Sequence, residues 1–310
     1  MLFTLRQLEY VVALAKHRSF REAAEACCVS QPSLSVQIAQ LETALGTRLF
    51  ERSPKRVVIT SAGEEFVRRA ARALTDLEQL EGMARSRRKP LAGELRLGAI
   101  PTMAPFLVPR LVELVKSQFP ECRLLLTEDT TARLLRRLDS GELDVLLIAM
   151  ESELGICEAT PLFRDPFLAA LPAAHPLAEK ATITFEELLG DGLLLLEDGH
   201  CLSAQVRSAC GASSSHIGDF RAGSLVTLLQ MVALGHGHTL LPEMARDALA
   251  RDPAQVALRP LAVPAYRTVG LAWRRGHSRA AELRLLAEAA ARGLGTQKKA
   301  DGKRAGPRPR

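Results

Sequence analysis

The first 50 residues have the periodicity of short amphipathic helices. Apolar residues recur at helical spacing between residues 5 and 14, and again between residues 20 and 27. Ser30 or Gln31 is the expected N-cap of a third helix, which Gly46 ends. A tight turn separates the second and third helices, so this pattern predicts a helix-turn-helix.

The next segment predicts a wing and a long helix. Residues 49–60 suggest a two-stranded basic ribbon around a proline turn, and residues 61–85 a single helix. On this helix, apolar residues alternate at spacings of four and three, which is typical of a coiled-coil seam between two chains. The predicted dimerisation residues are Phe66, Ala70, Ala73, Leu77, Leu80 and Ala84.

Beyond residue 90 short apolar runs alternate with helical patterns. This alternation predicts a parallel sheet with crossover helices, arranged as two Rossmann-like α/β subdomains with a crevice between them. The predicted strands are 94–100, 123–127, 145–149, 167–171, 193–196, 238–241 and 268–274, and the predicted helices are 107–119, 133–138, 225–234 and 280–292.

These patterns divide the 310 residues into four parts. We expect a winged helix-turn-helix domain at 1–60, a linker helix and hinge at 61–90, an effector domain at 91–295 and a disordered basic tail at 296–310. The fold class is therefore an all-α winged helix-turn-helix with a long linker helix, followed by an α/β effector domain.

The distribution of charge and the cysteine content limit the possible classes of function, location and cofactor. Residues 1–90 hold 15 basic against 10 acidic side chains, which suits a polyanion such as DNA. The N-terminus has no signal-peptide pattern and no run is apolar enough to span a membrane, so a cytoplasmic location is expected. Six scattered cysteines exclude a disulfide scaffold and are expected to be thiols there. His236 and His238 lack further ligands, so neither a metal nor a cofactor is expected.

Several motifs identify the chain as similar to the LysR family of bacterial regulators. They are Ala23-Ala24, Ser30-Gln31-Pro32-Ser33-Leu34-Ser35, Leu41-Glu42, Leu45-Gly46, Leu49-Phe50-Glu51-Arg52 and Thr60-Ser61-Ala62-Gly63. The resemblance extends to about residue 293 and implies an effector domain similar to periplasmic binding proteins. It also implies a homotetramer, built as a dimer of dimers, that acts on promoter DNA together with RNA polymerase.

The residues at the start of the third helix are the candidates for contacts with DNA bases and phosphates. The arginines of the wing are expected to position the protein on the DNA. The candidate DNA-binding residues are Ser30, Gln31, Pro32, Ser33, Ser35, Gln37, Arg52 and Arg56.

Within the family, the effector domain resembles the members that sense hydrogen peroxide. The main match is the segment 195–202, with Cys201 in it and Cys210 following. The resemblance assigns the peroxide pocket to Thr102, Thr131, His200 and Arg274. The chain departs from the pattern at Ser203-Ala204, where a charged pair is usual, and at Asp219, where histidine is common. These departures bear on the rate of the reaction with peroxide.

The residues support a thiol switch. Cys201 follows a strand and a turn and so falls near a helix N-terminus, where the helix dipole favours a thiolate. Thr102 and Thr131 each follow a strand, at the edge of the sheet where α/β folds bind ligands. We expect peroxide to oxidise Cys201, Cys210 to trap the product as a disulfide, and glutaredoxin or thioredoxin to reduce it.

Two other functions fit parts of the sequence. A LysR regulator could bind a small metabolite in its crevice, with Cys201 incidental. A thiol peroxidase would consume peroxide, but it would leave the winged helix without a use. The sequence therefore favours a peroxide-responsive regulator of oxidative-stress genes, activator or repressor, and not an enzyme.

Overall fold

The computed structural model divides into two compact units. The structure describes residues 2–53, 56–85, 89–150, 154–155, 157–189, 192–197, 199–210, 217–250 and 252–295, with backbone alone for 52, 53, 56, 78–85, 209, 210 and 217–219. One unit comprises Met1–Arg88 with Arg136–Leu143, and the other comprises Lys89–Leu135 with Asp144–Arg310.

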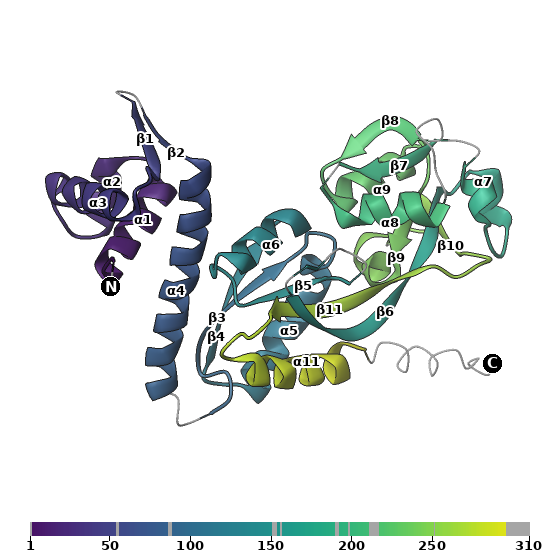
Figure 1. Ribbon diagram of the computed structural model, residues 1–310. Helices are drawn as coiled ribbons and strands as arrows, with labels where there is room; N and C mark the ends of the chain where they lie inside the picture. The colour runs from purple at the N-terminus through teal and green to yellow at the C-terminus, as the bar shows by residue number, and fades with distance from the viewer. Residues whose placement is uncertain are drawn as a thin grey trace. The chain divides into compact units, whose positions relative to one another are not determined.

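Three helices, a two-stranded ribbon and a long helix form most of the first unit (Figure 1). Ser19 and Ser30 cap α2 and α3 by accepting hydrogen bonds from the backbone N–H groups three residues on. Gly46 ends α3 in the left-handed conformation, with φ of 65°. The elements are α1 (Leu5–His17), α2 (Phe20–Ala26), α3 (Gln31–Leu45), β1 (Phe50–Ser53), β2 (Arg56–Ile59) and α4 (Ser61–Arg85).

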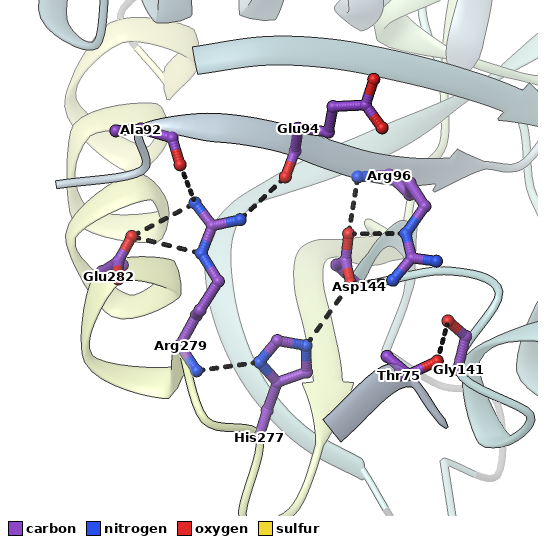
Figure 2. Close-up of polar contacts among 9 residues, drawn as sticks. All are labelled: Thr75, Ala92, Glu94, Arg96, Gly141, Asp144, His277, Arg279 and Glu282. Carbon is purple, nitrogen blue, oxygen red and sulfur yellow. Dashed lines mark hydrogen bonds and ion pairs between the residues drawn. The ribbon is translucent and has the colours of Figure 1, made fainter. Parts of the chain in front are cut away.

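Apolar faces of these elements meet in one core. Leu14, Leu34, Ile38 and Leu41 are completely buried in it. The first half of α4 closes this core, because Phe66 packs edge-on against Phe3 with ring centroids 5.9 Å apart. Residues Arg136–Leu143 belong to this unit through contacts with α4, among them the hydrogen bond from the Thr75 hydroxyl to the Gly141 carbonyl (Figure 2).

The second unit begins with a parallel βαβ arrangement. Strand β3 pairs in parallel with both β4 and β5, while helix α5 packs against helix α11 and strand β4. The elements are β3 (Gly93–Ala99), α5 (Ala104–Gln118), β4 (Cys122–Glu128), α6 (Thr131–Asp139), β5 (Val145–Ala149) and α11 (Ala280–Leu294). The parallel pairing agrees with the sequence prediction and brings the ends of β3 and β4 to one edge of the sheet.

The remaining elements of this unit are arranged around two long strands, β6 and β11. Strands β6 and β11 pair with each other along the sheet, and β6 continues to pair with β9 and β10 (Figure 1). The elements are β6 (Cys157–Pro172), α7 (Phe185–Leu189), β7 (Leu193–Leu196), α8 (Cys201–Cys210), β8 (Ile217–Ala222), α9 (Leu225–Ala233), β9 (Thr239–Pro242), α10 (Arg246–Leu249), β10 (Val256–Pro260) and β11 (Tyr266–Arg274), with short 3-10 helices at Pro176–Glu179 and Glu243–Ala245.

The sequence prediction of a parallel sheet was wrong for this part. β6 and β11 run antiparallel to each other, and β11 is antiparallel to β5. The pattern predicted only residues 167–171 of β6, because Pro161 and Pro166 interrupt its first half. Strands β8 and β10 were also missed. β6 and β11 link the two groups of elements.

Polar contacts fix the beginning of this unit to helix α11 (Figure 2). The Arg279 guanidinium donates to the Glu94 carbonyl at 2.8 Å and to Glu282, whose carboxylate accepts from the Leu91 N–H at 2.6 Å. These contacts hold the first residues after the linker against the start of α11. No helix among the residues that the structure describes is long and apolar enough to cross a membrane.

Candidate functional site

Cys201 is the first residue of α8, in a turn that the local sequence fixes. Gly199 has φ of 102°, a left-handed conformation that side chains rarely adopt, so glycine suits this turn. The buried Ser203 hydroxyl donates to the Leu196 carbonyl at 2.6 Å and ties α8 to the end of β7. The half-buried Cys201 thiol therefore lies at a helix N-terminus, as predicted, where the helix dipole favours an anion.

A crevice of about 640 Å³ opens beside Cys201. Thr131 at the start of α6 and His200 line it, so the structure brings these three predicted residues together. The remaining lining residues are Ala132, Leu135, Phe167, Gly199, Ala204, Gln205, Arg207, Ser208, Ala265 and Tyr266.

Among the residues that line this crevice, two buried polar atoms without a hydrogen-bond partner among the described residues lie close to Cys201 in the chain or follow a predicted strand. They are His200 Nδ1 and the Thr131 hydroxyl oxygen. Buried polar groups in folded proteins are almost always hydrogen-bonded, and each exception calls for an explanation, such as a catalytic role or a bound water or ion. The two residues come from different elements, α6 and the turn before α8, and both line the crevice that Cys201 lines. This arrangement can hold a small polar molecule beside the thiol.

Thr102 lies in a separate buried network. The Arg267 guanidinium donates to the Thr102 hydroxyl and carbonyl oxygens, each at 3.0 Å, and to the Asp165 carboxylate at 3.0 Å. Asp165 also accepts from the Met244 N–H. Burial raises the pKa of the Asp165 carboxyl, although the adjacent Arg267 charge opposes this. Arg267 is entirely buried and follows Tyr266, which lines the crevice.

Arg274 was assigned to the peroxide pocket by resemblance, and this assignment stays a prediction; Arg267 and Asp165 were not among the predicted residues. Arg274 is the last residue of β11 and is paired with Cys157 of β6. At about 3.3 Å per residue it lies about 23 Å along the strand from Arg267, and it is not among the residues that line the crevice. The sequence feature that could have indicated Arg267 is its position next to Tyr266, as a charged residue at the start of an otherwise apolar strand.

Several residues near the predicted Cys201–Cys210 pair are described only in part. Cys210 is the last residue of α8, but its side chain lies outside the described residues, as do the side chain of Asp219 and all of Asp198. Of the other cysteines, Cys27 packs against the helix-turn-helix core, where burial raises its pKa, and Cys28 is exposed in the turn.

The predicted DNA-binding residues have different environments. Gln31, Pro32 and Ser33 are exposed at the start of α3 and Ser35 is half-buried. Ser30 caps the helix, and the Gln37 side chain accepts a hydrogen bond from Gln7 at 3.2 Å. The side chains of Arg52 and Arg56 lie outside the described residues.

The residues of the predicted coiled-coil seam on α4 differ in how exposed they are. Phe66 packs into its own core, and Ala70 is buried within the chain at 4% exposure. Ala73 is half-buried, whereas Leu77 is 42% exposed. The side chains of Leu80 and Ala84 lie outside the described residues. Within the described part, Leu77 is therefore the seam residue most accessible to a second chain.

A winged helix-turn-helix with an α/β domain that has a ligand-sized crevice is the architecture of a one-component transcription regulator. Residues 5–64 match the model of the bacterial regulatory helix-turn-helix protein, lysR family, and residues 88–295 match that of the LysR substrate binding domain. The chain belongs to the LysR family of bacterial transcription regulators.

Similar proteins within this family are named OxyR. The chain is 41% identical over 286 residues to the DNA-binding transcriptional dual regulator OxyR of Escherichia coli K12, covering 92% of this chain and 94% of the relative. Full-length OxyR of Pseudomonas aeruginosa, in a variant form, superposes with a TM-score of 0.79 at 37% identity and covers 93% of this chain and 94% of that one. An H2O2-bound OxyR mutant of Corynebacterium glutamicum has a TM-score of 0.65 at 34% identity, over 94% of this chain and 92% of that one.

Proposed function

We propose that this protein is a peroxide-responsive transcription regulator of the OxyR type, in which Cys201 is the sensing thiol. The observation that carries the proposal is the pair of unpartnered buried polar atoms, Thr131 Oγ1 and His200 Nδ1, in the crevice that Cys201 lines. A peroxide is small, donates and accepts hydrogen bonds, and would satisfy both atoms while it lies against the thiol.

The chemistry follows from the position of Cys201. Its thiolate attacks one peroxide oxygen, the O–O bond breaks, and the departing hydroxide takes up a proton to leave as water. The hydroxyl of Thr131, a residue that lines the crevice, donates toward the oxygen that gains charge. Arg267 is not among the residues that line the crevice; it follows Tyr266, which is, and its hydrogen bonds to Thr102 and Asp165 hold this end of β11 in place.

Cys210 then condenses with the sulfenic acid at Cys201, releasing a second water and forming a disulfide. In the structure α8 is helical from Cys201 to Cys210, which separates their Cα atoms by about 14 Å at 1.5 Å per residue. A disulfide needs Cα atoms within about 7 Å. Closure of the bond therefore requires α8 to unwind, and the refolded segment is the signal passed to the rest of the molecule.

The proposed partners follow from the same function. The exposed start of α3 contacts promoter DNA in the major groove, and the protein works as a homotetramer, a dimer of dimers, with RNA polymerase. Glutaredoxin or thioredoxin returns the disulfide to thiols, so the cycle runs in the cytoplasm.

The experiment is disulfide mapping by mass spectrometry after one equivalent of H2O2, with remaining thiols alkylated. A peptide that joins Cys201 to Cys210, and that dithiothreitol separates, is the expected product. Cys201→Ser must abolish peroxide consumption, whereas Cys210→Ser must still form the sulfenic acid. If both cysteines remain alkylatable in excess H2O2, the proposal fails.

A second candidate is regulation by a metabolite bound in the crevice, with Cys201 incidental. The crevice volume of about 640 Å³, within the range of small-molecule sites, favours it. Under this alternative, Cys201→Ser would leave the transcriptional response unchanged.

A further inference from the structure

Helix α3 directs one apolar side chain away from the core of its own unit. Val36 is 53% exposed, whereas Leu34 and Ile38, two positions before and after it, are completely buried. At about 100° per residue, Val36 lies about 200° around the helix from each of them, on the opposite face. Single exposed apolar residues are common on protein surfaces, so the meaning of Val36 depends on what this face contacts.

The face that carries Val36 also carries two of the predicted DNA-binding residues. Val36 follows Pro32 by four positions and Ser33 by three, so the three side chains lie on one side of the first two turns of α3. Pro32 and Ser33 are exposed as well. The recognition helix of a helix-turn-helix places the residues near its N-terminus against base edges in the major groove. Under the proposed function, Val36 therefore lies within the surface that enters the groove.

Polar residues of α3 near this face are held by the protein itself. The Gln37 side-chain oxygen accepts a hydrogen bond from the Gln7 side chain of α1 at 3.2 Å. Glu42 is the one charged residue of α3, and its carboxylate accepts from the Leu49 and Phe50 N–H groups at 2.8 and 3.0 Å. Because α3 contains no lysine or arginine, its discrimination between bases depends on neutral and apolar side chains.

An apolar side chain in the major groove distinguishes thymine from the other bases. Thymine presents its C5 methyl group there, whereas the other bases are recognised by their hydrogen-bond donors and acceptors. A valine against the methyl group removes apolar surface from water on both partners, which stabilises the complex. A valine against a donor or acceptor removes water from that group without replacing its hydrogen bond, which costs free energy. Both effects favour thymine opposite Val36.

We propose that Val36 is a specificity-determining residue of the DNA-binding unit, which recognises a thymine in each half-site through the C5 methyl group. The inference rests on the DNA-binding part of the proposed function and is independent of the chemistry at Cys201. It adds an apolar contact to the polar candidates of α3. The operator should therefore hold a fixed thymine at the position that faces Val36.

Replacement of thymine by deoxyuridine tests this contact, because it removes the C5 methyl group and keeps every hydrogen-bonding atom of the base. The reduced full-length protein first selects its operator from a library of random duplexes. Fluorescence anisotropy then measures binding to that operator with deoxyuridine at each thymine in turn. We expect one position in each half-site at which the substitution weakens binding about fourfold, the effect of one buried methyl group.

Two variants assign this effect to Val36. Val36→Ser removes both methyl groups of the side chain, and serine has nearly the helix propensity of valine, so α3 is preserved. We expect this variant to bind the thymine and deoxyuridine operators within about 1.5-fold of each other, and to select operators in which this thymine is no longer fixed. Val263→Ser is the matched control, because Val263 is a valine of 67% exposure in the second unit; it should keep the fourfold effect.

The remaining outcomes separate the two claims. A deoxyuridine scan without a sensitive position would overturn the inference and leave the proposed function intact. So would a sensitivity that persists in Val36→Ser, or a loss of all DNA binding by that variant, because one methyl contact contributes only about fourfold. If the parent protein selects no operator, the DNA-binding part of the proposed function fails and the inference fails with it.

Discussion

At the scale of residues, two threonines near the sheet edge have different roles. The Thr102 hydroxyl oxygen accepts a hydrogen bond from Arg267, whereas the Thr131 hydroxyl has no partner among the described residues. Removal of the Thr131 hydroxyl therefore costs no hydrogen bond among the residues that the structure describes. Loss of this hydroxyl should therefore lower the rate of reaction with peroxide and leave the stability of the folded protein unchanged.

Thr131→Val tests this difference. We expect the melting temperature to remain that of the parent protein, while Cys201 oxidation by H2O2 slows about tenfold or more, because a donor to the developing charge is lost. Thiol alkylation kinetics measure the rate, and Thr127→Val, on β4 and outside the crevice lining, is the control. An unchanged rate would remove Thr131 from the site.

Much of the candidate site was predictable from residues alone. Thr131 follows β4, and His200 and Cys201 follow β7; each position after a strand was visible in the sequence, and the three residues line one crevice. The two strands belong to separate sheets, so their meeting depends on packing that the sequence pattern does not show. The choice between Arg267 and Arg274 was not predictable. Both belong to β11 and both are buried, and the hydrogen bonds of Arg267 to Thr102 and Asp165 arise from packing that the sequence pattern does not contain.

At the scale of elements, capping residues and a glycine made the helix ends predictable, whereas two prolines made the first half of β6 unpredictable. Ser19, Ser30 and Gly46 mark helix ends that the sequence predicted closely. In contrast, β6 extends ten residues before the predicted start, because its prolines occur where β11 tolerates them. Such tolerance depends on the partner strand and is not visible in the sequence.

A buried carboxylate fixes the register of β3 and β5. Asp144 accepts from the Arg96 backbone N–H at 2.8 Å and from its guanidinium at 2.9 and 3.1 Å, while His277 approaches at 3.7 Å (Figure 2). Burial opposes ionisation of Asp144, but His277 and Arg96 outweigh it and hold the pKa of the carboxyl well below its usual range.

Asp144→Asn should therefore destabilise the protein in a pH-dependent way. At neutral pH we expect a loss of about 3 kcal/mol in the free energy of unfolding, because Arg96 loses its buried partner. A lowered carboxyl pKa stabilises the fold in full above the unfolded value and less as pH falls toward the folded value. The gap between parent and variant should narrow below about pH 4.

Urea unfolding of both proteins at neutral and acidic pH measures this gap. Glu142→Gln is the control, because Glu142 is 58% exposed in its pair with Arg137 and such pairs contribute little. A gap that stays constant with pH would mean that the carboxylate charge of Asp144 does not stabilise the fold.

At the scale of the whole molecule, the proposed switch depends on one helix of the second unit, α8. Gly199 and Ser203 fix the N-terminus of α8, and Cys210 lies at its other end. The helix keeps the two cysteines too far apart to bond. Under the proposed function, oxidation would replace the local fold of α8, and we expect a change in the assembly on DNA to follow.

Hydrogen–deuterium exchange of the α8 backbone, before and after one equivalent of H2O2, tests this claim most directly. The account predicts slow exchange across residues 202–209 in the reduced protein and fast exchange once Cys201 and Cys210 are joined, with α9 unchanged as an internal reference. Dithiothreitol should restore the slow exchange. A Cys201–Cys210 disulfide that forms while α8 keeps its protection would contradict the account.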